Sequence, residues 1–220
     1  MAILGRPRAF DRDKAVEQAM YMFWQNGYES TSLSLLKAGI GKGISAPSFY
    51  AAFGSKEALF QECVQRYLAT FAQVTASLWN EDLPPRKAIE TTLRNSAKMQ
   101  CDDGHPKGCM VGLGVIGVPA DDRTETSSLA RSRAQTRAGM IFCVERGVES
   151  GELRLETNIR ALATVFDSFL LGLSTLARDG IPYSEMSTAI THIMSTWDAY
   201  STNIAIEQRN ASCGSNSGRA

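Results

Sequence analysis

The sequence predicts an all-α protein with a small N-terminal three-helix head and a larger helical body. Apolar residues recur at the three-to-four-residue spacing of a helix through nearly the whole chain, and no run alternates with the two-residue period of a strand. Ser, Asp or Pro precedes most of these segments and Gly follows several of them, as is typical of helix starts and stops. The composition, 44% hydrophobic and 21% charged, is that of an ordinary globular protein.

The first two helices are delimited by capping residues. Asp11 is a suitable N-cap for a helix with one apolar face, and Gly27 is placed to end that helix. A second, short helix is expected to begin at Ser30 or Thr31 and to run through Ala38. The sequence therefore predicts two helices in the first 38 residues.

A glycine-rich turn over residues 39–43 leads into the third helix. Pro47 suits the first turn of that helix, where its missing N–H costs nothing, and Gly54 suits its end. Ser55 is expected to cap a fourth helix whose apolar face continues to Leu78. The head is thus predicted to pass directly into a long helix.

Further helices are predicted in the body. Their expected spans are residues 84–101, 109–118, 124–150, 157–178 and 184–199, with Thr157 and Ser184 as caps of the last two. The expected organisation is a head of residues 1–54, a body of residues 55–200 and a tail of residues 201–220. The tail is small and polar, which predicts disorder.

Charge and cysteine usage limit the classes of protein. Net charge is zero, but residues 1–54 carry six Lys/Arg and four Asp/Glu, hence +2 against −2 for the remainder, which weakly favours a nucleic-acid contact at the head. The five cysteines form no CxxC pair, no export signal precedes them and no apolar run approaches a membrane span. We therefore expect a cytoplasmic protein with reduced thiols and no membrane association.

Two stretches carry a family resemblance. FDRDKAVEQAMYMFWQNGYESTSL and ISAPSFYAAFGSKEALF, within residues 10–60, resemble the N-terminal domain of TetR-type transcriptional regulators. The resemblance implies a helix-turn-helix head that binds double-stranded DNA and a body that binds a small effector and forms a homodimer. It implies a repressor of a palindromic operator, without enzymatic activity and without a cofactor or bound metal.

The resemblance places the DNA contacts in and around the third helix. The N-terminal residues of a recognition helix lie at the base edges, and hydroxyl, basic and helix-terminal groups contact phosphates. Basic N-terminal arms reach a groove or the backbone. The turn before the third helix is longer than is usual in the family, which leaves the pose of the base-reading residues open. The expected contacts are Arg6, Arg8, Thr31, Lys42, Ser45, Ala46, Pro47, Ser48, Tyr50 and Lys56.

The body has candidate residues for dimerisation and for an effector pocket. As the resemblance implies, the last two helices form the dimer interface, although their apolar residues also suit the core of one chain. The interface candidates are Phe169, Leu173, Leu176, Met194 and Trp197. The pocket candidates are Trp79, Met99, Met110, Phe142, Phe166 and Phe169, which likewise suit a core.

Cys101, His105 and Cys109 form the most suggestive chemical cluster, within CDDGHPKGCM. Thiolates and imidazole bind copper or zinc, and a cysteine near a helix start and Lys107 can react with electrophiles or oxidants. A cysteine in an apolar run is also often a small buried hydrophobe. A cysteine enzyme with Cys109 as nucleophile and His105 as base is the alternative function, but no third, orienting group is evident.

Overall fold

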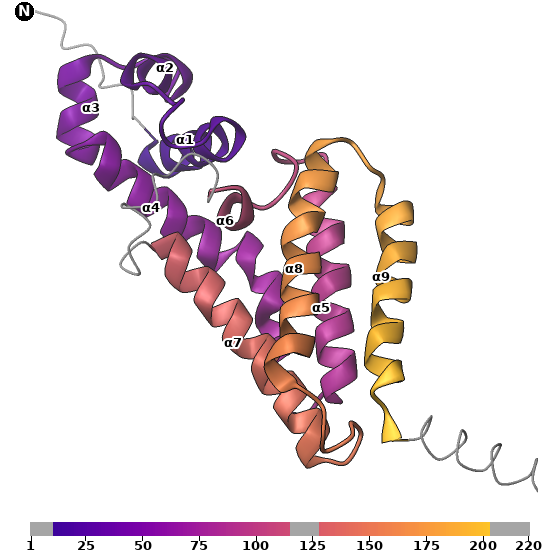
Figure 1. The fold of residues 1–220 in the computed structure, drawn as a ribbon. Coiled ribbons are helices and arrows are strands. Elements are labelled where there is room, and N and C mark those ends of the chain that lie inside the picture. Colours follow the sequence, from indigo (N-terminus) through magenta and orange to yellow (C-terminus); the bar gives the residue numbers. More distant parts are fainter. Residues whose placement is uncertain (1–10, 115–127, 203–220) are drawn as a thin grey trace, which may run out of the picture.

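The computed structural model describes residues 11–114 and 128–202, and within them the chain is helical. A head of three short helices lies at one end, α4 leads from it into the body, and α5, α7, α8 and α9 pack side by side (Figure 1). The elements are α1 (Arg12–Asn26), α2 (Leu33–Gly39), α3 (Ala46–Phe53), α4 (Lys56–Ala69), the 3₁₀ helix η1 (Phe71–Trp79), α5 (Pro85–Gln100), α6 (Met110–Leu113), α7 (Ser128–Glu149), α8 (Ile159–Arg178) and α9 (Tyr183–Ala199). The described residues confirm the predicted all-α class.

Most predicted caps in the head are confirmed. The side chains of Asp11 and Ser55 accept backbone N–H bonds at the starts of α1 and α4, and Ser45, for which no cap was predicted, does so at the start of α3. Gly27 and Gly54 end α1 and α3 at positive φ, 80° and 73°, a conformation that glycine adopts without a steric penalty. These caps fix the lengths of the helices and so the directions in which the chain turns.

Three other predicted caps are wrong by one or two residues. Ser32, not Ser30 or Thr31, caps α2, and its Oγ accepts from the N–H of Leu35 at 3.1 Å. Asn158, not Thr157, caps α8 through the N–H of Ala161. The last helix begins at Tyr183 after Pro182, without the expected cap from Ser184. In each case the true start lies within two residues of the predicted one.

The long helix predicted after Ser55 is interrupted. α4 ends at Ala69, and Thr70 leaves helical geometry with φ −120° and ψ −85°. The Thr70 hydroxyl donates to the carbonyl of Arg66 at 2.7 Å, and the chain continues as η1. The apolar pattern continued through this break because η1 also buries one side, with Leu78 in the core.

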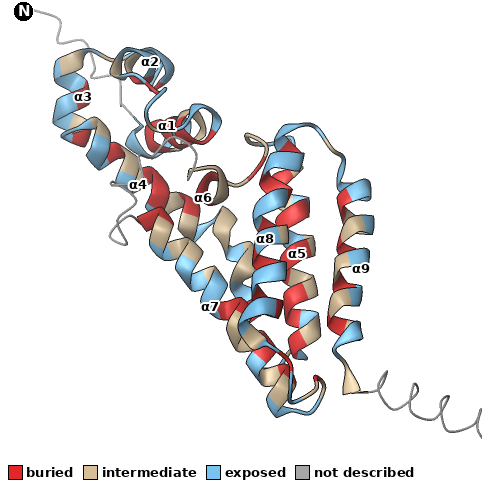
Figure 2. Ribbon diagram, in the orientation of Figure 1, coloured by how far each residue is buried: buried red, intermediate tan, exposed pale blue. Residues whose placement is uncertain are grey.

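Two hydrophobic clusters organise the chain. The body cluster joins α5, α7, α8 and α9, with the buried residues of these helices facing one another (Figure 2). The head cluster continues from α1–α3 along α4 and includes Met110, Val111 and Leu129. The head therefore packs on α6 and the start of α7, and the boundary predicted after residue 54 stays a prediction.

Of the described helices, α8 alone is long and apolar enough to cross a membrane by length and composition. It contributes Phe166 and Leu173 to the body core. A helix in the core of a globular protein can be as apolar as one that crosses a membrane. Beyond α9, Ser201 pairs with Leu153 and the Thr202 hydroxyl donates to the carbonyl of Gly151, so the chain is held through residue 202. The remainder of the predicted tail, 203–220, lies outside the described residues.

Candidate functional site

The helix α3, where the DNA contacts were predicted, has one buried and one exposed side. Phe49 and Phe53 pack into the head cluster, with ring centroids 5.4 Å apart. Tyr50 points the other way and is 51% exposed. Ser45, Pro47 and Ser48 at the helix start are exposed and Ala46 is partly so; the hydroxyls of Ser45 and Ser48 lie 2.9 Å apart. The start of this helix exposes hydroxyls and small side chains. Such side chains allow a helix to approach the base edges in a DNA groove closely and to form hydrogen bonds with them.

Lys56 is held in place at the start of α4, directly after α3. Its ammonium lies 4.2 Å from the ring centroid of Tyr28, a cation–π contact that orients the lysine. The first N–H groups of a helix lack intrahelical partners and favour anions. Lys56 and the N-terminus of α4 therefore form a positively charged site, suited to an anion, directly after α3.

The turn before α3 uses three consecutive residues of positive φ: Gly41 at 59°, Lys42 at 64° and Gly43 at 91°. The N–H of Gly41 donates to Oε1 of Gln18, and the N–H of Ile44 returns to the carbonyl of Lys37. The expected long glycine turn is therefore pinned to α1 and α2. Lys42 is exposed, as a phosphate contact requires, although its conformation costs a non-glycine residue about 1 kcal/mol.

Thr31 does not occupy the surface expected of a phosphate contact. It is 0% exposed, and its hydroxyl donates to the carbonyl of Gly27 at 2.6 Å. The hydroxyl closes the turn between α1 and α2, and its neighbour Ser32 is exposed instead. Arg6 and Arg8 lie outside the described residues.

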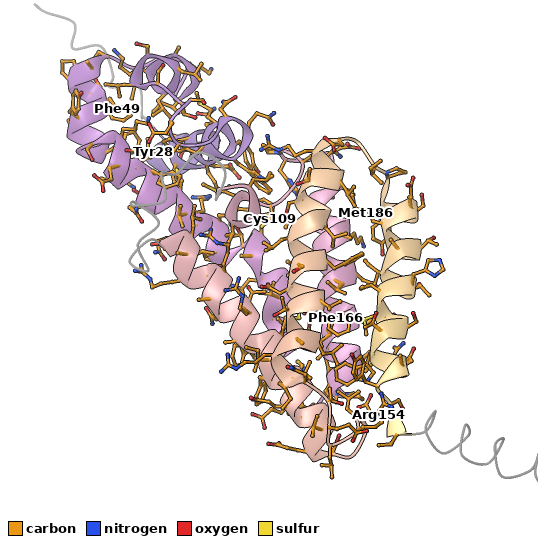
Figure 3. The ribbon with its side chains drawn as sticks, viewed as in Figure 1. Tyr28, Phe49, Cys109, Arg154, Phe166 and Met186 are labelled. Carbon is orange, nitrogen blue, oxygen red and sulfur yellow. The ribbon has the colours of Figure 1, made fainter. Side chains whose placement is uncertain are left out.

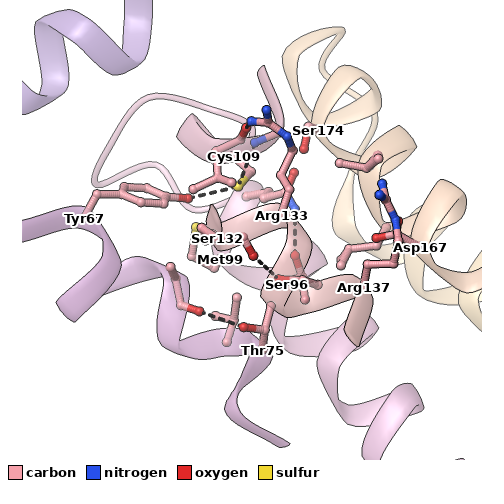
Figure 4. Close-up of a pocket in the computed structure, with 18 residues that line it drawn as sticks. Tyr67, Thr75, Ser96, Met99, Cys109, Ser132, Arg133, Arg137, Asp167 and Ser174 are labelled. Atoms are coloured by element: carbon pink, nitrogen blue, oxygen red, sulfur yellow. Dashed lines mark hydrogen bonds and ion pairs between the residues drawn. The ribbon is translucent and has the colours of Figure 1, made fainter. Parts of the chain in front are cut away.

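Pocket-lining residues gather in the body between α4, η1, α5, α6, α7 and α8 (Figure 4). The empty volume is about 570 Å³, which includes space open to solvent. The lining is largely apolar with interspersed hydroxyls. Its members are Tyr67, Ala72, Val74, Thr75, Ser96, Met99, Gln100, Cys109, Val111, Gly112, Ser132, Arg133, Thr136, Arg137, Asp167, Leu170, Leu171 and Ser174.

Met99 and Cys109 are the pocket candidates that the structure places in this lining. Trp79 is 45% exposed and stacks on Phe142, with centroids 5.6 Å apart. Met110 packs with the head cluster, and Phe166 lies inside the body core (Figure 3). These four were expected from hydrophobicity, and they fill the core or pair with each other instead. Phe169 packs at the edge of the body core.

The structure separates the Cys101, His105 and Cys109 cluster. The Cys109 sulfur accepts from the hydroxyl of Tyr67 at 3.2 Å, and Cys101 packs against Met186 at 3.7 Å (S–S distance). The His105 ring stacks on Trp24, with centroids 4.5 Å apart. No metal-binding cluster of His, Cys, Asp or Glu occurs within residues 11–114 and 128–202. The nucleophile–base pair of an enzyme is likewise not formed, because Cys109 and His105 have other partners.

The cysteines differ in their surroundings. Burial raises the pKa of the Cys63 thiol to about 12 and that of Cys143 to about 11, so both stay protonated at neutral pH. Burial also raises the pKa of Cys101, which Lys107 partly offsets. Cys109 is partly exposed, lines the pocket and accepts a second hydrogen bond, from the N–H of Gly112 at 3.4 Å. Its sulfur is therefore accessible from the pocket.

Arg178, at the end of α8, joins the head to the body. Its guanidinium donates to the carbonyls of Trp24 at 2.6 Å, Gln25 at 3.0 Å and Lys107 at 3.1 Å. The indole N–H of Trp24 donates to the carbonyl of Gly108 at 3.2 Å. α1, the loop of residues 101–109 and α8 thus meet at one junction beside the pocket, and sequence reasoning missed it.

Comparison with known proteins decides the family. The family model described as bacterial regulatory proteins, tetR family, matches residues 15–63. The HTH-type transcriptional repressor ComR of Escherichia coli K12 is 30% identical over 195 residues, which cover 88% of this chain and 91% of ComR. The chain belongs to the TetR family. Its head is accordingly a helix-turn-helix DNA-binding domain, and the protein is a transcriptional regulator.

Two further relatives of this TetR-family protein agree. The HTH-type transcriptional repressor BdcR of the same E. coli strain is 34% identical over 111 residues, half of this chain and 55% of BdcR. A cysteine-substituted form of the TetR-family regulator CifR, complexed with 26 bp double-strand operator DNA, is similar in structure, with a TM-score of 0.75 and 33% identity. That match covers 87% of this chain and all of the CifR chain.

Proposed function

We propose that this TetR-family protein is a homodimeric repressor. It holds a palindromic operator through α3 and releases it when its pocket is filled or Cys109 is modified. The observation that carries the proposal is the two-sided α3: Phe49 and Phe53 fix it to the head, while Ser45, Pro47, Ser48 and Tyr50 are exposed. Operator DNA in the CifR complex and the repressor names of ComR and BdcR support it.

Within this proposal, Ser45, Ala46, Pro47 and Ser48 lie at the base edges. Lys42 and Lys56 contact phosphates through their charge, and Tyr50 does so through its exposed hydroxyl. Arg6 and Arg8 are proposed to reach a neighbouring groove. Thr31 contributes by closing the α1–α2 turn and not by touching DNA.

The outer face of α8 is the proposed centre of the dimer. Val165 and Leu176 are exposed there, and Asp167, the sole charged residue between positions 161 and 177, points inward. Of the five residues predicted for the interface, Leu176 is exposed and Phe169 is partly exposed. Leu173, Met194 and Trp197 are buried within one chain, so they support the interface from behind.

Selection of genomic DNA fragments by the purified protein tests the DNA-binding proposal. A palindromic site is expected, with affinity that falls steeply with salt. Lys56→Gln is expected to weaken binding several-fold at every site and to lower the salt slope by about one, because one phosphate contact is lost. Lys98→Gln, the same change on the exposed surface of α5, is the control and should bind as the original does. Failure to enrich any symmetric site would contradict the proposal.

A maleimide tests the role of Cys109. The thiolate sulfur bonds to an alkene carbon of the reagent, and the proton lost by the thiol ends on the neighbouring carbon. Treatment is expected to lower operator affinity at least tenfold, because the adduct fills the pocket between Tyr67 and α6. Cys109→Ser keeps an acceptor for Tyr67 and should remove the response.

Cys101→Ser is the matched control in this experiment and should keep the response. Equal loss of operator binding in treated Cys109→Ser would show that modification elsewhere releases the DNA. The proposal assigns the protein no enzymatic activity and places it in the cytoplasm, where bacterial DNA lies.

A further inference from the structure

One polar atom in the pocket wall lacks a partner. Gln100, the last residue of α5, is 1% exposed and lines the pocket. Its Nε2 donates to the hydroxyl oxygen of Ser96 at 2.7 Å, whereas its Oε1 accepts no hydrogen bond from the described residues. A buried acceptor left unsatisfied costs about 1–3 kcal/mol, and a ligand that donates to it recovers that energy.

We propose that the pocket binds a neutral, mainly apolar molecule that carries a hydroxyl group, and that this hydroxyl pairs with Gln100. The inference rests on the proposed function, since it names the class of effector. The hydroxyl donates to Oε1, which is the free atom of the amide because Nε2 is held by Ser96.

The other groups in the pocket argue for a neutral ligand. Asp167 is buried and already paired, because Nε of Arg137 lies 2.9 Å from its Oδ2. Arg133 donates to the carbonyl of Val111 at 3.1 Å. A carboxylate beside Gln100 Oε1 would set acceptor against acceptor, and an ammonium would lose its hydration without gaining an opposite charge. The free group that Gln100 presents is thus an acceptor, which a neutral hydroxyl satisfies.

The apolar part of the pocket wall indicates the chemistry of the rest of the ligand. Ala72, Val74, Met99, Val111 and Leu170 line the pocket around Gln100, and burying a hydrocarbon chain against them is favourable by about 0.8 kcal/mol for each CH₂ group. Part of the pocket is open to solvent, so a chain or ring can enter it from outside. An aliphatic or aromatic alcohol has both properties.

Two isomers of one formula test the inference by calorimetric titration of the full-length protein. 1-Octanol and dibutyl ether have the same atoms, but only the alcohol donates a hydrogen bond. 1-Octanol is expected to bind roughly five- to tenfold more tightly. In Gln100→Met, which keeps the side-chain length, the two isomers should bind alike. Gln135→Met, on the exposed surface of α7, is the control and should keep the preference.

Equal affinities of the two isomers for the unaltered protein would overturn the inference. That result is expected if a buried water, and not the ligand, pairs with Gln100. Tighter binding of octanoate than of 1-octanol would also overturn it. The comparison in the unaltered protein stands even if Gln100→Met does not fold. Operator binding by the same preparation separates the two proposals. If the protein binds its operator but does not prefer the alcohol, only the inference about the pocket is overturned. If the protein does not bind an operator, the proposed function is contradicted.

Discussion

Replacing Gly108 with alanine is expected to lower the free energy of unfolding by about 3 kcal/mol. A Cβ at this position would lie 2.8 Å from the backbone oxygen of Ser174 and 2.7 Å from Cδ1 of Leu113. The glycine also has φ +82°, which an alanine adopts at a cost of about 1 kcal/mol. The backbone of α8 cannot move aside without disturbing the pocket, so overpacking adds about 2 kcal/mol.

Gly180→Ala is the matched control for Gly108→Ala. Gly180 has nearly the same φ, +83°, but a Cβ there would meet nothing within 4 Å. It should lose only the conformational term, about 1 kcal/mol. Urea unfolding at one protomer concentration measures both variants, because the stability of a dimer depends on concentration. Equal losses would mean that the 101–109 loop adjusts freely and that the contact with Ser174 is unimportant.

Replacing Arg178 with methionine is expected to cost about 2 kcal/mol and to weaken the signal from body to head. Methionine keeps much of the apolar stem but none of the donors that bind the carbonyls of Trp24, Gln25 and Lys107. Arg178 is exposed, so the three bonds contribute less than buried ones would. Without them α1 is no longer tied to the end of α8, a helix that lines the pocket.

The two effects of Arg178→Met are measured separately. Unfolding in urea gives the stability, and the ratio of operator affinities before and after maleimide treatment gives the coupling between pocket and head. Arg160→Met, at the exposed first turn of α8, is the control and should change neither. An unchanged affinity ratio in Arg178→Met would show that the signal travels through α4 or α6 instead.

The head was predictable because its signals are local. Asp11 and Ser55 cap helices within three residues of themselves, and Gly27 and Gly54 satisfy a backbone requirement at their own positions. Such signals depend little on the rest of the fold. The interruption at Thr70 was missed because hydrophobic spacing does not separate an α-helix from a following 3₁₀ helix that buries the same side.

The pocket was largely unpredictable for a different reason. Gln100, Asp167 and Tyr67 come from three helices, and only tertiary packing brings them to one cavity. Apolar periodicity identifies the face of a helix that is buried. It does not tell whether another helix of the same chain, a second protomer or a ligand covers that face. Leu173 and Trp197 were therefore assigned to a dimer interface, although they lie in the core of their own chain. Phe166 failed as a pocket residue for the same reason.

Trp24 supplies the head–body junction with its own optical reporter. Its indole stacks on His105 and meets the ring of Tyr67 edge-on, with centroids 4.8 Å apart. The chain has three tryptophans, and the other two, Trp79 on the surface and Trp197 inside the body, lie away from this contact. With phenylalanine at those two positions, a single tryptophan remains at the point where α1 meets the 101–109 loop. Its emission then follows the separation of head and body in solution without an added label.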